Sequence, residues 1–379
     1  MLLHGFDMST DSRIAFKPKA SLLSAEERAQ VMKDLGFGQL FTEHMVTIPC
    51  DMSTGEASSA KWGQALLSPY QALTLDPAAS VLHYGQAIFE GFKAYRQPDG
   101  GIKTFRPEQN ARRLNTSARR LAMPELPEDL FILAADSLIR QEQSWVPNGV
   151  GESLYLRPLM IATEAALGVR PAKKYLFVLF GSPSGLYFKK GIKPVSVWVS
   201  TEYVRAAPGG TGATKCAGNY AASLVAQQAA LAEGCDQVVW LDAVHRTYVE
   251  EMGGMNLFFV YRDGSGVKLV TPKLTGSLLP GITRASILEL AHDNGFAVEE
   301  RLISVDEWKA DLESGRMTEV FACGTAAVIT PVGTVKTANG EWSMQGGDAG
   351  SVAMQLREQL LAIQHGTAPD PHGWMHTVC

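Results

Sequence analysis

Strand-like and helical runs follow one another along this chain without the regular alternation that builds a doubly wound parallel sheet. Apolar runs at 153–162 and 175–180 have the length and composition of strands, whereas 107–121 and 128–145 follow the helical period. Pro107 favours a helix start, because the first helical position needs no backbone N–H donor. This order of elements predicts an α+β fold.

A segment without periodicity, GSPSGLYFKKG at 181–191, interrupts the pattern near the middle of the chain. Its glycine, serine and proline content predicts a loop between domains. A length of 379 residues also fits two domains at roughly 100–200 residues each. We therefore expect an N-terminal domain at 1–180, an interdomain loop at 181–192 and a larger C-terminal domain at 193–379.

The second half of the chain carries its own set of predicted elements. It opens with a β-rich run at 194–203 and a loop at 207–212. Gly234 is expected to end the helix that follows, because glycine adopts the left-handed conformation common at helix ends. The remaining predictions are strands at 237–241, 255–261 and 267–271 and helices at about 220–233, 284–294 and 349–362.

Charge and cysteine content narrow the classes of partner. A net charge of -5 with 19% charged residues gives no electrostatic reason to bind nucleic acid or an anionic membrane. No run approaches the roughly 20 apolar residues of a membrane span, and the first residues lack a secretory pattern. The five cysteines show no C-x-x-C spacing, so we expect reduced thiols and no metal site. We expect a cytoplasmic protein that acts on small molecules.

Lys215 is the first candidate for catalysis. It lies in the segment GGTGATKCAGNY at 209–220, whose small residues allow a planar ligand to approach the backbone. Enclosure by apolar neighbours favours a neutral amine, which can attack a carbonyl carbon. A solvated loop lysine is the alternative that this segment alone leaves open.

An acidic pair, Glu250 and Glu251, ends a predicted strand before two glycines. A carboxylate beside a pyridine nitrogen keeps that nitrogen protonated, which lets the ring accept electrons. Strand alternation places the two side chains on opposite faces, so we expect only one to point inward. A turn with two solvated carboxylates is the alternative.

Two segments offer donors for an anion. Gly281, Ile282 and Thr283 precede a predicted helix, where free backbone N–H groups and the helix dipole attract negative charge. The small-residue turn 323–327 adds the hydroxyl of Thr325. A bidentate cation is expected from the helix at 107–121, where four arginines are candidates: Arg112, Arg113, Arg119 and Arg120.

These residues lie in motifs that resemble the branched-chain aminotransferase family of fold-type IV pyridoxal-phosphate enzymes. The resemblance runs from about Gly36 to Val332, and the motifs follow the family's order. They are FGQLFTEHM, LHYGQAIFEGFKAY, FRPEQNARRLNTSARRLAMP, SLYLRPLM, TGATKCAGNYAAS, LLPGITR and CGTAAVITPV. The resemblance implies a two-domain enzyme with pyridoxal 5'-phosphate at the domain interface, and a homodimer.

The resemblance also implies roles for individual residues. Lys215 would bond the cofactor covalently, Tyr220 would contact its phenolic oxygen, and Glu251 would contact its pyridine nitrogen. The phosphate would be held by Arg113, by the amides at Gly281, Ile282 and Thr283, and by Thr325. The substrate pocket would be formed by Phe37, Tyr84, Tyr155, Arg157, Tyr187, Ala326 and Ala327.

The expected reaction transfers the amino group of leucine, isoleucine or valine to 2-oxoglutarate and yields glutamate. Aromatic walls suit aliphatic side chains, since they bury apolar surface without requiring a polar partner. Two alternatives stay open from sequence. The first is another fold-type IV enzyme, such as a D-amino-acid aminotransferase or aminodeoxychorismate lyase, and the second is a non-catalytic protein that binds the cofactor.

Overall fold

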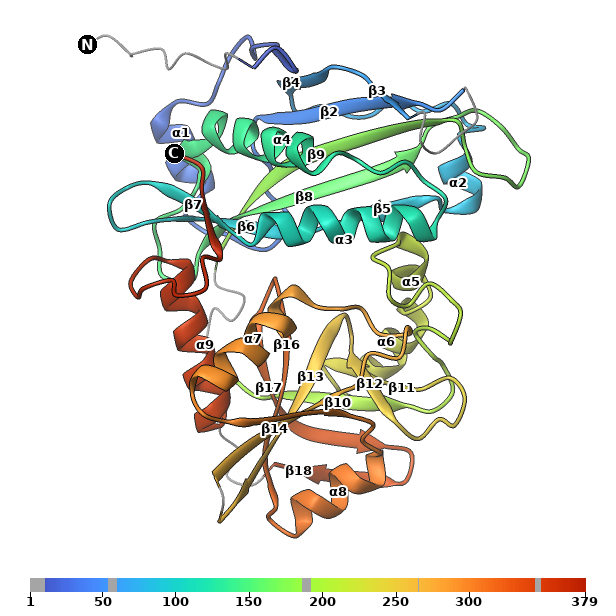
Figure 1. Ribbon diagram of the computed structural model, residues 1–379, viewed down its shortest axis with the longest axis vertical. Coiled ribbons are helices and arrows are strands. Elements are labelled where there is room, and N and C mark those ends of the chain that lie inside the picture. The colour runs from blue at the N-terminus through green and yellow to red at the C-terminus, as the bar shows by residue number, and fades with distance from the viewer. Residues whose placement is uncertain (1–10, 54–59, 186–191, 265, 345–348) are drawn as a thin grey trace. The chain divides into compact units, whose positions relative to one another are not determined.

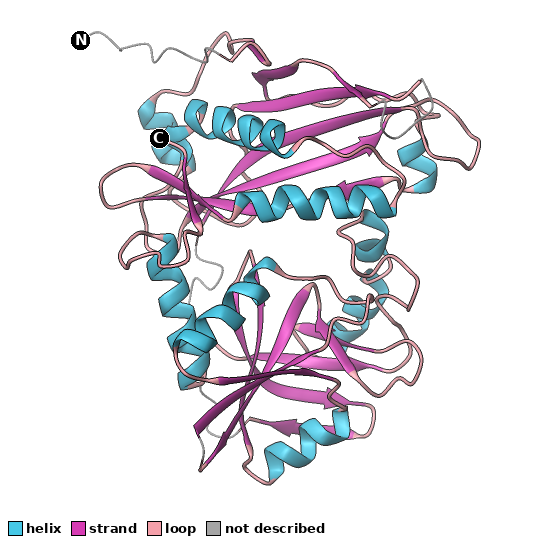
Figure 2. Cartoon of the chain, viewed as in Figure 1, coloured by secondary structure: helices cyan, strands magenta, loops and turns pink. Residues whose placement is uncertain are grey.

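The computed structural model describes residues 11–53, 60–185, 192–264, 266–344 and 349–379. The chain forms two compact units (Figures 1 and 2). The first contains the N-terminal half together with the C-terminal segment Gln364–Cys379, and the second extends to Ile363. Strands and helices are mixed in both, which confirms the predicted α+β class.

The first unit is a mainly antiparallel sheet with helices packed on it. Its central strands run in the order β4, β2, β9, β8, β6 and β7, with β5 paired to β8. Their bounds are β1 Ile14–Phe16, β2 His44–Asp51, β3 Lys61–Trp62, β4 Ala65–Pro69, β5 Ala87–Phe89, β6 Phe92–Arg96, β7 Ile102–Phe105, β8 Ser153–Ala162, β9 Lys174–Ser184 and β19 Met375–Thr377. Its helices are α1 Ala25–Val31, α2 Ser80–Tyr84, α3 Pro107–Arg120 and α4 Glu128–Gln141, with a 3₁₀ turn at Gln143–Trp145.

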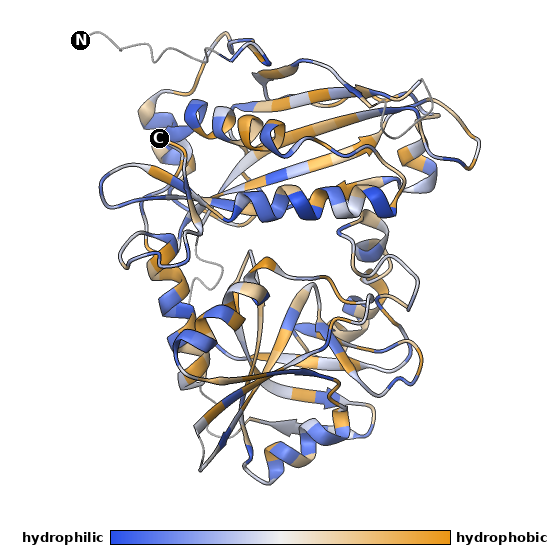
Figure 3. Ribbon diagram, in the orientation of Figure 1, coloured by the Kyte–Doolittle hydropathy of each residue, from blue (hydrophilic) through white to orange (hydrophobic). Residues whose placement is uncertain are grey.

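Helices α3 and α4 cover one face of this sheet because each has an apolar side (Figure 1). In α3 the buried residues Ala111, Leu114 and Ala118 recur at the helical period. Figure 3 shows hydrophilic residues along much of α3, whereas most residues of β9 are hydrophobic. Apolar burial of this kind holds the helices in place at roughly 25 cal/mol per Å² removed from water.

The second unit contains a closed ring of strands. Its order is β12, β11, β10, β17, β16 and β13, and an additional pairing of β12 with β13 completes the ring. Closure leaves these strands without a free edge on the ring. The strands of the unit are β10 Val195–Ser200, β11 Gln237–Leu241, β12 Val249–Met252, β13 Met255–Asp263, β14 Gly266–Pro272, β15 Ala297–Arg301, β16 Met317–Gly324, β17 Val328–Thr337 and β18 Gly340–Ser343.

Helices pack around the ring. They are α5 Ala217–Ala221, α6 Leu224–Ala232, α7 Ile282–Asp293, α8 Val305–Glu313 and α9 Ser351–Gln364. The main core joins the strands to Trp308 of α8 and includes Phe259, whose ring lies edge-on to that indole at 5.2 Å between centroids. A smaller cluster packs Ala226 and Ala230 of α6 against Trp240 of β11.

The main differences between the structure and the sequence predictions are four. Strand β9 continues to Ser184, so the first residues of the expected loop at 181–192 are strand; residues 186–191 lie outside the described part of the chain. The C-terminal segment belongs to the first unit, because β19 pairs with β7 there. The expected helix at about 220–233 is divided into α5 and α6, and the one at 128–145 ends at Gln141 before the 3₁₀ turn.

Candidate functional site

Lys215 and Tyr220 form a hydrogen-bonded pair at the start of α5. The Lys215 amine donates to the Tyr220 hydroxyl over 2.8 Å. Asn219 of α5 fixes the loop that precedes Lys215, since its amide donates to the backbone carbonyls of Thr211 and Thr214. The turn of α5 therefore returns the tyrosine to the lysine that precedes the helix, as a spacing of five residues allows.

Glu251 is the deepest charged group in this part of the second unit. One carboxylate oxygen accepts from the Leu279 backbone N–H at 2.8 Å and from the Asn256 amide at 3.3 Å. Burial raises its pKa to about 7, although the nearby Arg205 guanidinium and the Leu279 N–H favour the charged form. Glu251 therefore changes its protonation state near neutral pH.

Glu250 is also buried, which corrects the expectation that only one of the two carboxylates would point inward. Its side chain accepts from the hydroxyl of Ser277, which is itself 1% exposed. Burial raises the pKa of Glu250. Strand alternation places the two carboxylates on opposite faces, but the loop that carries Ser277 covers the second face, so neither is solvated.

Arg205, which the sequence analysis did not single out, links three segments of the site. Its Nε lies 2.7 Å from the second Glu251 oxygen, as an ion pair without the alignment of a hydrogen bond. Its Nη2 donates to the backbone carbonyls of Gly212 and Ser277. The sequence does show a charged residue, Arg205, directly before the small-residue segment 206–214. It does not show the partner, because Glu251 lies 46 positions further along the chain.

Strand register brings the small-residue turns together. The β12–β13 hairpin turns at Gly253 and Gly254, and Gly253 needs glycine because its φ is +56°. In the next strand pair Asn256 is opposite Cys323, and Gly324 lies against Met255. The turn that carries Thr325, Ala326 and Ala327 therefore lies beside the hairpin that follows Glu251.

Helix α7 begins next to the same hairpin. A Cβ on its N-cap residue Gly281 would lie 2.1 Å from the Asn256 side-chain oxygen, so the close contact requires glycine. Gly281 has no side chain to cap the helix, which leaves the amides of Ile282 and Thr283 at the positive end of the dipole. Asn256 contacts both this helix start and Glu251.

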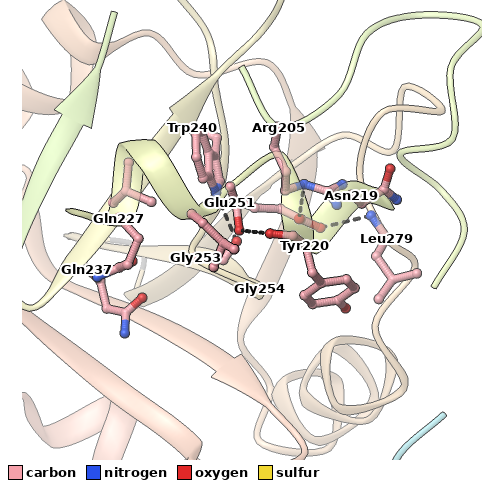
Figure 4. A pocket seen from close by; sticks show the side chains of 13 residues that line it. Arg205, Asn219, Tyr220, Gln227, Gln237, Trp240, Glu251, Gly253, Gly254 and Leu279 are labelled. Atoms are coloured by element: carbon pink, nitrogen blue, oxygen red, sulfur yellow. Dashed lines mark hydrogen bonds and ion pairs between the residues drawn. The ribbon is translucent and has the colours of Figure 1, made fainter. Parts of the chain in front are cut away.

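A pocket of about 160 Å³ borders Tyr220 and Glu251 (Figure 4). Arg205, Trp240, Gly253, Gly254 and Leu279 also line it. Figure 4 shows the Arg205 guanidinium beside the Glu251 carboxylate, and the Trp240 indole donating to the Gly253 carbonyl at 2.9 Å. The carboxylate and the tyrosine ring are thus both reached from this pocket.

In the first unit, Arg113 of α3 forms a bidentate contact with Glu90. Its Nε and Nη2 donate to the two carboxylate oxygens at 2.7 and 2.8 Å. Glu90 is fully buried and also accepts from the Asn110 amide at 2.7 Å. The orientation of the Arg113 guanidinium is therefore fixed by a carboxylate that sequence reasoning did not assign.

The three competing arginines of α3 have different surroundings. Arg112 and Arg119 are more than half exposed and contact the surface carboxylates Glu128 and Glu125, and Arg120 is exposed. Only Arg113, among the described arginines of this helix, is largely buried, at 11% side-chain exposure. Burial and fixed geometry favour it as the cation of an anion site.

Three of the predicted substrate residues are neighbours in the first unit. The Phe37 and Tyr155 rings meet edge to face at 5.0 Å, and the Arg157 guanidinium lies over Tyr155 and over Phe89. The Tyr155 hydroxyl lies against Gly91, where a Cβ would be only 1.9 Å away. Tyr84 ends α2 and donates its hydroxyl to the Leu167 carbonyl, and Tyr187 lies outside the described residues.

The residues of the second unit fit the chemistry of pyridoxal phosphate. They include an amine for its aldehyde, a phenol for its ring oxygen and a buried carboxylate for its ring nitrogen, namely Lys215, Tyr220 and Glu251. The uncapped start of α7 fits a phosphate. Among the described residues no group of histidine, cysteine and carboxylate side chains could hold a metal ion, and no helix has the length and apolarity for a membrane span.

Comparisons with known proteins found similar chains. Residues 87–335 match the family model described as amino-transferase class IV. The probable branched-chain-amino-acid aminotransferase of Streptomyces coelicolor is 58% identical over 97% of this chain and 99% of its own length. The branched-chain-amino-acid aminotransferase of Mycolicibacterium smegmatis is 60% identical over 92% of this chain and 93% of its own length.

Solved structures show the same fold. The branched-chain amino acid aminotransferase of Escherichia coli superposes with a TM-score of 0.72 at 28% identity, over 89% of this chain and all of that one. A second branched-chain amino acid aminotransferase, solved with pyridoxamine 5'-phosphate, gives a TM-score of 0.72 at 28% identity, over 90% of this chain and all of the other. The branched-chain aminotransferase of the archaeon Thermoproteus uzoniensis, solved with norvaline, gives a TM-score of 0.69 at 25% identity, over 83% of this chain and 97% of the other.

Proposed function

Because the chain belongs to the amino-transferase class IV family, and within it to the branched-chain-amino-acid aminotransferases, we propose that it transfers the amino group of L-leucine, L-isoleucine and L-valine to 2-oxoglutarate. The products are the branched-chain 2-oxo acids and L-glutamate. The observation that carries the proposal is the set formed by the Lys215–Tyr220 pair and the buried Glu251, within a chain 58% identical to such an enzyme.

We propose the following roles for the groups around the cofactor. Bound pyridoxal phosphate supplies an electron sink for the charge left when the substrate loses its α-proton. Lys215 Nζ accepts that proton as general base and later returns it. Tyr220 orients the amine through the 2.8 Å hydrogen bond, and Glu251 holds a proton on the ring nitrogen.

The anion-binding groups are proposed to hold the phosphate. Arg113 offers a guanidinium fixed by Glu90, and the amides of Ile282 and Thr283 with Gly281 offer the helix start. Thr325 adds a hydroxyl from the β16–β17 turn. The register of β13 and β16 supports this grouping within the second unit, because it places that turn beside the hairpin that contacts α7.

We propose that the substrate's aliphatic chain contacts aromatic rings and that its carboxylate contacts small-residue backbone. Phe37 and Tyr155 form an apolar wall, and Tyr84 and Tyr187 are assigned to the same pocket by family resemblance. Arg157, stacked on Tyr155, suits the second carboxylate of 2-oxoglutarate or glutamate. Ala326 and Ala327, in the turn between β16 and β17, are assigned to the α-carboxylate by family resemblance.

Replacement of the proposed base tests the function. Lys215→Ala should lower turnover of L-leucine with 2-oxoglutarate by on the order of 10²–10⁴-fold or more, because both the base and the covalent link are lost. The cofactor's visible absorbance should shift as well. Lys273→Ala, an exposed lysine of the same unit, is the matched control and should keep wild-type turnover. Near-normal activity of Lys215→Ala would refute the proposal.

A half-reaction panel separates the rival functions. L-Leucine should convert the cofactor's absorbance to that of its amino form, whereas D-alanine should not. Conversion by D-alanine alone would indicate a D-amino-acid aminotransferase, and no conversion by any amino acid would indicate a non-catalytic binding protein. The absorbance change requires no coupling enzyme, so binding and chemistry are observed together.

A homodimer and a cytoplasmic location also belong to the proposal. The dimer rests on family resemblance, and the location rests on the sequence. Light scattering coupled to size-exclusion chromatography tests the first, with a mass twice that of the 41.0 kDa chain as the expected result. A fluorescent fusion tests the second.

A further inference from the structure

The charged groups around Glu251 are few and can be named. Arg205 favours the ionised carboxylate most, Lys215 favours it less, and Glu250, the neighbouring carboxylate on β12, opposes it. The remaining contacts are neutral donors, the Leu279 N–H and the Asn256 amide. Without Arg205, the buried Glu251 carboxylate would keep only the weaker effect of Lys215 in favour of its charged form, and Glu250 would still oppose that form.

The Arg205 guanidinium is held rigidly where it faces Glu251. Its side chain is 6% exposed, and its Nη2 is tied to the backbone carbonyls of Gly212 and Ser277. A Cβ on Gly212 would lie 2.2 Å from the Ser277 carbonyl oxygen, so these two loops touch and the arginine joins both. The cation cannot move away from the carboxylate without breaking these contacts.

We infer that Arg205 is a positioning residue that shifts Glu251 toward its charged form, and thereby sets the pH range in which the protein binds pyridoxal phosphate tightly. This inference rests on the function proposed above. Arg205 acts through Glu251: an ionised carboxylate can stabilise a protonated ring nitrogen, whereas a neutral carboxyl group cannot. Arg205 Nε and the Glu251 carboxylate form an ion pair without the alignment of a hydrogen bond. The positive charge of Arg205 therefore affects the ionisation of Glu251 more than a hydrogen bond from Nε does.

The test measures cofactor affinity against pH in the cofactor-depleted protein. Arg205→Gln removes the charge and keeps an amide donor for the loop carbonyls, and Arg205→Lys keeps the charge. For wild type, affinity should rise with pH as Glu251 ionises. For Arg205→Gln this rise should move roughly 1–3 pH units higher, the usual effect of a neighbouring arginine on a carboxylate. Arg205→Lys should remain closer to wild type.

Two comparisons separate this role from simple support of the loops. In a Glu251→Gln background the carboxylate no longer titrates, so adding Arg205→Gln should not move the pH profile. A 1-deaza analogue of the cofactor, with carbon in place of the ring nitrogen, should bind wild type and Arg205→Gln with similar affinity. Arg301→Met, which removes an arginine ion-paired to Glu307 in the same unit, should leave the profile unchanged.

The outcomes are distinct. An equal loss of affinity at every pH, for both the cofactor and its deaza analogue, would make Arg205 a loop-holding residue and overturn the inference. An unchanged profile in Arg205→Gln would overturn it as well. Either result leaves the proposed function intact as long as wild type binds the cofactor and Lys215→Ala is inactive. Circular dichroism of each variant verifies folding, and Arg205→Lys provides the comparison with the smallest disturbance.

Discussion

Among the described residues, each unit has an arginine and a carboxylate that are paired and largely buried, and the two pairs divide their tasks in opposite ways. In the Glu90–Arg113 pair the carboxylate is fully buried and accepts from both guanidinium nitrogens and from Asn110, so the arginine is the member suited to bind a ligand. In the Glu251–Arg205 pair both side chains line the pocket, but the arginine is anchored to two backbone carbonyls, so the carboxylate is the member suited to contact a ligand.

Both pairs consist of a glutamate and an arginine, yet the member suited to bind a ligand differs. The residue types in an ion pair therefore do not show which of the two binds a ligand. We call the holder in each pair the side chain whose contacts within its own unit fix the orientation of its partner. Glu90 has four donor contacts, counting the 3.3 Å contact from the Gly91 N–H, and thus acts as a holder. Arg205 is the holder in the second pair, because its Nη2 donates to two backbone carbonyls while its Nε faces the carboxylate.

The largest expected effect comes from breaking the first pair. Glu90→Ala should lower the free energy of unfolding by about 3–5 kcal/mol, because Arg113 keeps its charge and loses its bidentate carboxylate. Glu251→Ala should cost less at neutral pH, because a carboxylate whose pKa is about 7 is only partly charged there. Urea unfolding of the cofactor-free protein measures both. A larger loss for Glu251→Ala would reverse the assignment of holder and ligand-binding member.

The next effect concerns the arginine that Glu90 holds. Arg113→Lys keeps the charge but loses the planar fork that contacts Glu90 and suits a phosphate. Affinity for pyridoxal phosphate should fall by about 10- to 100-fold, since a charge-assisted hydrogen bond contributes roughly 1.5–3 kcal/mol. Fluorescence titration measures the loss, and binding of pyridoxal without its phosphate should change little. An equal loss for pyridoxal would assign Arg113 a purely structural role.

The stability that Glu251 contributes should depend on pH. Burial raises the Glu251 pKa from 4.5 to about 7, so its contribution to stability is fully present below pH 4.5 and is lost as the pH rises through 7. The slope is on the order of 1 kcal/mol per pH unit in this window. The test compares how the melting temperature changes between pH 5 and 8 in the cofactor-free wild type and in cofactor-free Glu251→Gln. The variant should show a flatter dependence; equal slopes would contradict the raised pKa.

Sequence reasoning recovered what depends on nearby residues. Pro107 begins α3 as predicted, and the pattern also gave the extent of β8. Lys215 is a candidate from its own segment and Tyr220 is its neighbour by family resemblance, and one helical turn is enough to bring them into contact. Such features need only local backbone geometry, which periodicity and capping preferences describe.

The remaining features depend on pairing between distant segments. The ring closure of β12 with β13 and the return of β19 to the first unit follow from register, which no local pattern specifies. For the same reason neither buried pair was predicted, since Glu90 and Arg113 lie 23 positions apart and Arg205 and Glu251 lie 46 apart. The burial of Glu250 depends on Ser277, which comes from a third segment.

The smallest expected effect comes from breaking an ion pair between an arginine and a glutamate at the surface. Arg119 lies six positions after Arg113 on α3 and contacts Glu125, but both side chains are about half exposed. Arg119→Gln should change the free energy of unfolding by less than about 1 kcal/mol, because water and salt screen such a pair. It should leave cofactor affinity unchanged, whereas Arg113→Lys lowers it. The contrary result is that Arg119→Gln weakens phosphate binding as strongly as Arg113→Lys does. That result would show that burial and a fixed orientation do not determine which arginine of α3 binds the phosphate.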